Sequence, residues 1–395
     1  MEVINIVAIS LISFIFLLIL LKQIKVLDSP LNQKLEKGLL SFVNRNYFIL
    51  VGYLFFIAVV VRVYQFGSVP DGLNQDGAMA GVDALALSQY GADRFGMVMP
   101  VHFTAWGYGQ MSVLLSYLMV PFIKIFGLSP LTARLPMLIV SLVAIYIIYK
   151  FSYRLLGKWF AIISLAVIAI NPWQIMQSRW ALDCNLFPHF FIFGTYAMYL
   201  GLKKKAFMYV SMVMFALSMY SYGISFYTVP VFLFVMAIYL IVKKLIKPLD
   251  LIICIGTYLI IAAPILTMVV INFFKLSTIN LPFMTIAYFS NSIRMNDLLF
   301  FKPSIEQLFF NIATMFQITI LQFPDLPWNS IKEYGPLYFA SIPFIFIGGI
   351  AFIRRTFKQT SGQDIENSVK KPVCLFFVCL HLLVFSLVAF AMELI

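Results

Sequence analysis

Long apolar stretches alternate with short polar segments along most of the chain. Many of the apolar stretches are about 18 residues long or more, enough for a helix to cross a hydrocarbon core of roughly 30 Å. The pattern predicts an all-α polytopic membrane protein with about ten transmembrane helices. The expected spans are residues 4–21, 47–63, 134–149, 159–171, 186–202, 206–222, 225–242, 249–271, 336–353 and 373–391.

Composition supports this class. The 395 residues are 62% hydrophobic and 11% charged, whereas soluble domains carry about 25% charged residues. The net charge of +12 comes from basic residues gathered in short loops, a pattern typical of cytoplasmic loops in membrane proteins. We therefore expect a multi-pass protein of the plasma membrane, with the lipid bilayer as a partner and without a nucleic-acid partner.

The basic loops also set the expected orientation. The segments placed inside hold well over half of the 28 Lys and Arg residues, and they are 22–46, 150–158, 203–205, 243–247 and 354–371. The apolar stretch 111–126 separates two topologies. As a span it would put the basic segment 150–158 outside, whereas as a helix lying in the membrane plane it keeps that segment inside. Charge favours the in-plane helix.

This orientation divides the chain into four parts. An N-terminal helix and a basic connector occupy residues 1–46. A transmembrane module follows at 47–271, with a first external loop at 64–133 and a second at 172–188. A long external segment covers 272–335. The C-terminal spans, 336–395, end without a tail, which fits either a natural short form or a truncated chain.

The first external loop concentrates polar and charged residues in a largely apolar chain. Alanines and leucines predict a helix over 77–90, which places Asp76 near its N-cap and Asp83 two turns later on roughly the same face. Asp76 is then either a helix cap, worth about 1 kcal/mol, or a general base toward a hydroxyl group. The candidates for substrate contact in this loop are Asp83, Asp93, His102, Trp106 and Tyr108.

Arginines and one more acid flank this loop. Arg134 heads a span, where its guanidinium suits either a phosphate clamp or the lipid headgroups, and headgroup contact is the favoured interpretation for Arg62. In the second loop Arg179 and Asp183 are spaced to pair on one helical turn, with belt tryptophans around them. A functional interpretation places both residues beside the first loop.

The remaining polar features are weaker. Asp325 and Asn329 precede a predicted span, either as sugar contacts or as ordinary turn residues. The three histidines have no partner ligands at recognised spacings, so no cofactor is predicted and a divalent metal is left open. The chain has no Gly-rich phosphate loop after a strand and no soluble nucleotide domain, which favours a lipid-borne sugar donor over a sugar nucleotide.

The chain resembles GT-C glycosyltransferases of the protein O-mannosyltransferase and aminoarabinose-transferase type (glycosyltransferase family 39-like), over residues 47–350. The resemblance rests on motifs in a fixed order. They are PDGLNQDGAMAGVDALAL…GADRFG…P in the first loop, FGLSPLTARLP before the next span, NPWQIMQSRWALDCNLFP in the second loop and LQFPDLPWN…YGPLY in the third.

The resemblance implies a GT-C-like fold with in-plane helices in the first loop. It also implies a polyprenyl-phosphate-linked sugar donor on the external face and inversion at the anomeric carbon. By position, Asp76 matches the acid that deprotonates the acceptor, Arg134 the arginine heading the next span, and Asp183 the acid of the second loop. The hydroxyl acceptor is left open between a protein, a cell-wall polymer and a glycolipid.

The chain departs from the family at two places. The family commonly has Asp-Glu where this chain has Asp76-Gly77, and charged residues of related aminoarabinose transferases are missing around residues 106–108. Metal binding, reduced activity and an unusual substrate are therefore open. Two other functions are weighed against transfer: a transporter or flippase of lipid-linked saccharide, and a non-catalytic subunit of a cell-envelope glycosylation complex.

Overall fold

The computed structural model describes residues 38, 41–105, 109–290, 305–319, 321–324, 335–338 and 342. The predicted spans 4–21 and 373–391 lie outside these residues, as does most of the predicted span 336–353.

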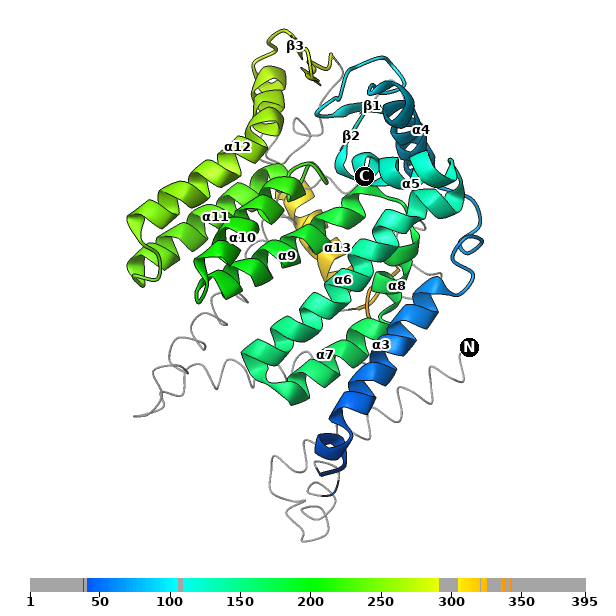
Figure 1. The fold of residues 1–395 in the computed structure, drawn as a ribbon, viewed down its shortest axis with the longest axis vertical. Coiled ribbons are helices and arrows are strands. Elements are labelled where there is room, and N and C mark those ends of the chain that lie inside the picture. Colours follow the sequence, from blue (N-terminus) through cyan, green and yellow to red (C-terminus); the bar gives the residue numbers. More distant parts are fainter. Residues whose placement is uncertain are drawn as a thin grey trace.

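Most of the described residues form α-helices that run side by side (Figure 1). The helices are α3 (Tyr47–Val63), α4 (Gln75–Tyr90), α5 (Leu114–Phe126), α6 (Pro130–Leu156), α7 (Lys158–Ile170), α8 (Pro172–Arg179), the 3-10 turn η1 (Asp183–Asn185), α9 (Leu186–Gly201), α10 (Lys205–Ser218), α11 (Ser225–Val242), α12 (Pro248–Phe273) and α13 (Ile305–Thr319). Two antiparallel hairpins complete the described elements: β1 (Phe103–Ala105) with β2 (Gly109–Met111), and β3 (Ile279–Leu281) with β4 (Met284–Ile286).

The helices follow the predicted spans closely in the middle of the chain. α3 and α11 have the predicted bounds, and α6 extends beyond its predicted span at both ends. Within the described residues, α6, α11 and α12 are long and apolar enough to cross a membrane. A fourth crossing results if α7 and α8, bent by 58° at their junction, count as one. The structure thus shows a largely helical chain with membrane-spanning character, and the count of about ten spans stays a prediction.

Local sequence explains where the long helix α6 begins and ends. Ser129 and Thr132 form a capping box, and Pro130 occupies the first turn, where it costs no hydrogen bond. Gly157 ends the helix with a φ of +88°, a conformation that favours glycine, and the chain turns there into α7.

Aromatic packing joins α9 to α11. The rings of Phe191, Phe215 and Phe232 meet with centroid separations of 5.4, 4.8 and 5.3 Å. Gly194 permits this packing, because a Cβ there would lie 2.9 Å from the Phe215 ring. A second apolar cluster, which includes the buried Met79, joins α4 and α5 to the start of α9.

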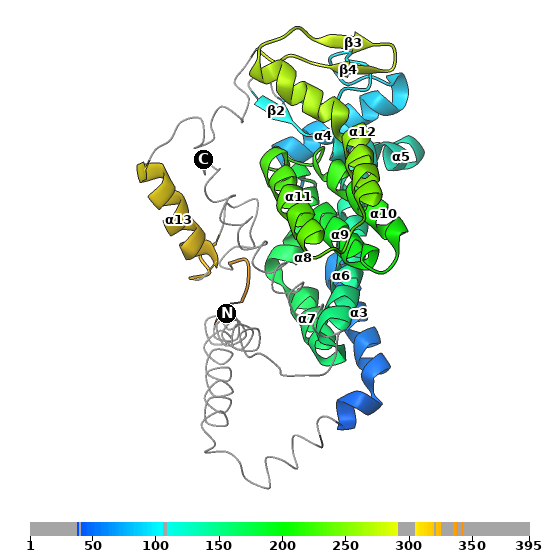
Figure 2. The ribbon, with the colours of Figure 1, turned by 90° about the vertical axis from the view of Figure 1, so that its left-hand side faces the viewer.

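α4, α5 and the two hairpins gather at the upper end of the helices in Figures 1 and 2, here called the loop end. Leu128, just after α5, lies against Gly81 of α4. Arg134, at the start of α6, donates to the Phe66 carbonyl at 3.2 Å. The chain therefore leaves α5 at the same end at which it entered. The in-plane orientation of α5 stays a prediction.

Candidate active site

The first turn of α4 presents Asp76 at the loop end. The helix begins two residues earlier than the sequence predicts, because the Asn74 side chain caps it by accepting from the Gly77 N–H at 2.9 Å. The interpretation of Asp76 as the cap is therefore wrong. Its carboxylate is half-buried and has no hydrogen-bond or ion-pair partner in the part of the chain that the structure describes. The helix N-terminus around it favours a negative charge.

Gly77 brings the second loop against this turn. A Cβ at position 77 would lie 2.6 Å from the Ala181 carbonyl oxygen, closer than real Cβ atoms approach. The first turn of α4 is thus in backbone contact with the segment that connects α8 to Asp183. This contact gives a physical reason for the departure from the family's Asp-Glu: the space that a side chain at position 77 would occupy is filled by Ala181.

Asp183 ties the same segment to the start of α5. The side chain is 8% exposed. Its Oδ2 accepts from the Ser112 N–H at 3.2 Å, and its Oδ1 accepts from the Cys184 N–H at 2.8 Å. The structure therefore places this acid of the second loop beside the first loop, next to β2.

Arg134 and Arg179, both buried, hold the segment that leads into the first loop. Arg134 comes from α6 and Arg179 ends α8. Their guanidinium groups donate to the backbone carbonyls of Val61, Arg62, Gln65, Phe66, Gly67, Val69, Pro70 and Gly72. Gly72 lies shortly before Asp76, so the two arginines position the start of α4. A phosphate contact for either arginine stays a prediction; the Arg134 Nε is a buried donor without a partner in the described part of the chain.

Two expectations about arginines are wrong. Arg179 and Asp183 do not share a helical turn, because α8 ends at Arg179 and a separate 3-10 turn begins at Asp183. Arg62 does not reach toward lipid headgroups, because its side chain is fully buried. It donates to the Gln174 Oε1 at 2.8 Å and to the Ala169 carbonyl in the last turn of α7 at 2.8 Å.

Asp83 and Asp93 organise the chain that follows α4. Asp83 is 1% exposed, and its Oδ2 lies 3.5 Å from the Arg94 Nη1. Burial raises the pKa of Asp83 to about 6, outweighing the Arg94 guanidinium, which lowers it. Asp93 accepts from the Phe95 and Met97 N–H groups, both at 2.9 Å. These buried contacts are structural, and substrate binding by either acid stays a prediction.

His102 lies where the segment 272–335 contacts the first loop. Its ring packs near Phe226 of α11 and Phe289, with centroids 6.4 and 6.0 Å away. The neighbouring Val101 N–H donates to the Thr285 carbonyl in β4 at 3.1 Å. The described start of the segment 272–335 is therefore part of the loop end. A substrate contact by His102 stays a prediction.

The described part of the third-loop motif LQFPDLPWN…YGPLY contacts the chain just before the second loop. The Asn171 side chain donates to the Pro336 carbonyl at 2.9 Å, and the Tyr338 hydroxyl donates to the Ile170 carbonyl at 3.0 Å. Four candidates lie outside the described residues: Trp106, Tyr108, Asp325 and Asn329. Within the described ranges no three His, Cys, Asp or Glu side chains come together as they would around a metal ion.

Sequence reasoning missed the residues that assemble this end. Arg94 pairs with Asp83, Gln174 with Arg62, and Ala181 meets Gly77. The Asp-Gly pair was a usable signal, because a glycine inside a helix often marks the close approach of another backbone. The other contacts join residues far apart in the chain and leave no local pattern.

The family model described as dolichyl-phosphate-mannose-protein mannosyltransferase matches residues 111–269. The match runs from β2 into α12, so it includes Arg134, Arg179 and Asp183 and leaves Asp76 outside. It confirms the resemblance to glycosyltransferases of this type. A search of the curated proteins found no match.

Several solved structures are similar to the chain. One is the archaeal oligosaccharyltransferase AglB from Archaeoglobus fulgidus, in complex with an inhibitory peptide and a dolichol-phosphate, with 15% identity and a TM-score of 0.46 over 85% of this chain and 39% of that one. Another is ArnT from Cupriavidus metallidurans in the apo state, with 13% identity and a TM-score of 0.45 over 85% and 63%. The chain spans less than two thirds of either protein.

Proposed function

We propose that this protein is a membrane glycosyltransferase that moves a sugar from a polyprenyl-phosphate donor to a hydroxyl acceptor, on the external face and with inversion. The observation that carries the proposal is the Asp76 carboxylate. It lies at the junction of the two loops that carry the family-like motifs, half-buried and without a partner in the described part of the chain.

Asp76 suits a base better than the other acids of the loop. A base must reach the acceptor hydroxyl, and Asp83 and Asp93 are 1% and 4% exposed with their carboxylates turned to Arg94 or to backbone N–H groups. Asp76 is accessible and rests on a helix whose first turn is fixed by Asn74 and Ala181. A positioned carboxylate of this kind takes the proton as the hydroxyl attacks the anomeric carbon.

The leaving group is the lipid phosphate, which gains negative charge as the glycosidic bond breaks. Arg134 and Arg179 concentrate positive charge below the start of α4, in a buried setting where it acts more strongly than in water. Preorganised cations of this kind stabilise the charge that develops in the transition state. The Arg134 Nε offers a donor that no described backbone group uses.

Proximity contributes the remainder of the rate. The spans would hold the prenyl tail in the bilayer, so that the sugar is delivered to the loop end in a restricted orientation. Holding donor and acceptor in place converts a bimolecular step into an effectively unimolecular one. The acceptor is a hydroxyl of a protein, a cell-wall polymer or a glycolipid.

Asp76→Asn tests this proposal. The amide keeps the shape of the side chain and cannot take a proton, so transfer from a radiolabelled polyprenyl-phosphate sugar should fall about 10²–10⁴-fold. Asp71→Asn is the matched control, because Asp71 is an exposed acid of the same loop outside α4. Equal transfer by the Asp76 variant and the wild type, at equal membrane abundance, would reject the assigned base.

The same assay separates the two alternatives. Movement of labelled donor across vesicles without any transfer product would indicate a flippase. Transfer that appears only when envelope membranes are added to the purified protein would indicate a subunit of a larger complex. Mass spectrometry of envelope glycans and polyprenyl-phosphate sugars in a deletion strain would name the donor and the acceptor.

A further inference from the structure

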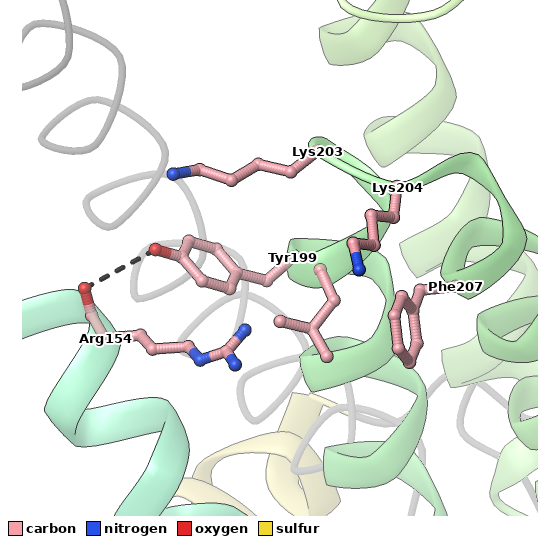
Figure 3. Close-up of a pocket in the computed structure, with 6 residues that line it drawn as sticks. Arg154, Tyr199, Lys203, Lys204 and Phe207 are labelled. Carbon is pink, nitrogen blue, oxygen red and sulfur yellow. Dashed lines mark hydrogen bonds between the residues drawn. The ribbon is translucent and has the colours of Figure 1, made fainter.

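A cavity of about 380 Å³ opens at the end of the helices opposite Asp76. It lies between the end of α6, the end of α9 and the start of α10 (Figure 3). Its lining residues are Arg154, Tyr199, Leu200, Lys203, Lys204 and Phe207. The Tyr199 hydroxyl donates to the Arg154 backbone carbonyl at 3.5 Å and joins α9 to α6 at the centre of the group.

The cavity is built for an anion. Arg154 and Lys204, two of its lining residues, are exposed cations, and no lining side chain is acidic. The nearby acid Asp250 is engaged elsewhere, since its Oδ2 lies 2.7 Å from the Nζ of Lys205, which does not line the cavity. α10 also begins here without a side-chain cap, and the N-terminus of a helix favours negative charge. The Arg154 guanidinium and the Lys204 ammonium group at one hollow match the oxygens of a phosphate.

The other walls are apolar and lie at a membrane surface. Leu200 and Phe207 line the same cavity, and Phe207 is 38% exposed. Arg154 and Lys203–Lys204 belong to two of the basic loops that charge places on the cytoplasmic side. A ligand that fills the cavity therefore needs a phosphate beside a hydrocarbon portion, at the depth of the inner headgroups.

We propose that this cavity binds the phosphate of an anionic phospholipid from the inner leaflet, with its glycerol and upper acyl carbons against Leu200 and Phe207. The negative lipids of that leaflet attract basic segments in general. The cavity adds a defined binding site, so that one lipid is held at one place. The site is independent of sugar transfer, because it lies at the other end of the molecule from Asp76.

Native mass spectrometry of the full chain released from detergent tests the proposal. Dioleoyl-phosphatidylglycerol is titrated against the wild type, the double variant Arg154→Gln/Lys204→Gln and the control Lys243→Gln/Lys247→Gln. The control removes two exposed charges at the same end that do not line the cavity. We expect the Kd of the most tightly bound phosphatidylglycerol to be about 30-fold higher for the Arg154→Gln/Lys204→Gln variant than for the wild type, at about 1 kcal/mol for each lost charge. The control should bind as the wild type does.

Four outcomes would overturn the proposal. Equal binding by the wild type and the cavity variant would show that the lipid does not bind in the cavity. Equal loss of binding in both variants would show that general surface charge attracts the lipid. Retention of phosphatidylcholine as strong as that of phosphatidylglycerol would show that the phosphate charge is not recognised. In a further arm, inorganic phosphate at millimolar concentration should leave the lipid bound, and displacement would assign the cavity to a free anion.

Discussion

Gly77 shows at the scale of one residue how two distant loops are held together. Its missing side chain allows the Ala181 carbonyl to approach the first turn of α4, the turn that carries Asp76. A residue that looks like a loss when compared with the family's Asp-Glu is therefore a packing requirement of this chain. The consequence is that the backbone of the second loop, not a second acidic side chain, occupies the space next to Asp76.

Gly77→Ala should disturb this junction. The new Cβ would meet the Ala181 oxygen at 2.6 Å, so one backbone must move, and overpacking of this kind costs about 1–3 kcal/mol. Thermal unfolding in detergent should show a lower midpoint, and transfer should fall with it. Gly52→Ala in α3 is the control, because nothing lies within 4 Å of its Cβ position. If Gly77→Ala left the protein as stable as Gly52→Ala does, the close contact would be contradicted.

Asp83 predicts a dependence of stability on pH. Its pKa is raised by burial from 3.8 to about 6, so in this window the folded chain holds a proton that the unfolded chain has released. Stability should therefore fall as pH rises from about 4 to about 6, by on the order of 2 kcal/mol, and change little above that. Asp83→Asn should remove this dependence in denaturant titrations at several pH values. A wild type whose stability instead rises across this window would show that the Arg94 ion pair dominates.

At the scale of elements, the short helix α8 fixes the entrance to the first loop. Arg179 at its end binds four carbonyls around the end of α3, and Gln174 within it binds Arg62. The second loop thus holds the first loop in place. These contacts would position Asp76, the proposed base, on a loop that follows a single helix.

Arg179→Lys tests whether these contacts hold the first loop in place. A single ammonium cannot serve the carbonyls of Val61, Arg62 and Val69 together, and each buried carbonyl left unpaired costs about 1–3 kcal/mol. The Gln65 carbonyl keeps its backbone donors, the N–H groups of Ser68 and Val69. Hydrogen–deuterium exchange should rise across residues 61–72, with a loss of transfer. Arg45→Lys, an exposed change in the chain before α3, should alter neither. Unchanged exchange in the Arg179 variant would show that the loop is held by other contacts.

Elements were predictable from sequence wherever apolar residues follow one another without interruption, as the bounds of α3 and α11 show. The helix around Asp83 was also predictable, and only its cap was misplaced, because Asn74 and Asp76 are both good caps and the choice depends on the following turn. The roles of Arg62 and Arg179 were not predictable. Their partners are mainly backbone carbonyls in other elements, which are the same in every sequence.

At the scale of the molecule, two chemically different ends face away from each other. The loop end gathers the acids and Asp76, and the opposite end gathers Arg154 and the lysines of the α9–α10 turn. α6 joins the two, since it carries Arg134 at its start and Arg154 in its last turn, 27 residues that rise about 40 Å. That length matches a full membrane with its headgroups, so the ends should lie on opposite sides of one bilayer.

Single cysteines in an otherwise cysteine-free chain would test this arrangement. Ser68→Cys at the loop end should react with a membrane-impermeant maleimide in intact cells, because the charge pattern predicts that the loop end faces outward. Lys158→Cys and Lys247→Cys should react only after permeabilisation, because positive loops stay in the cytoplasm. All three positions are exposed, so protection reports the side of the membrane rather than burial. If residues 111–126 crossed the membrane, position 158 would instead react in intact cells together with position 68, and both the in-plane α5 and the cytoplasmic lipid site would be wrong.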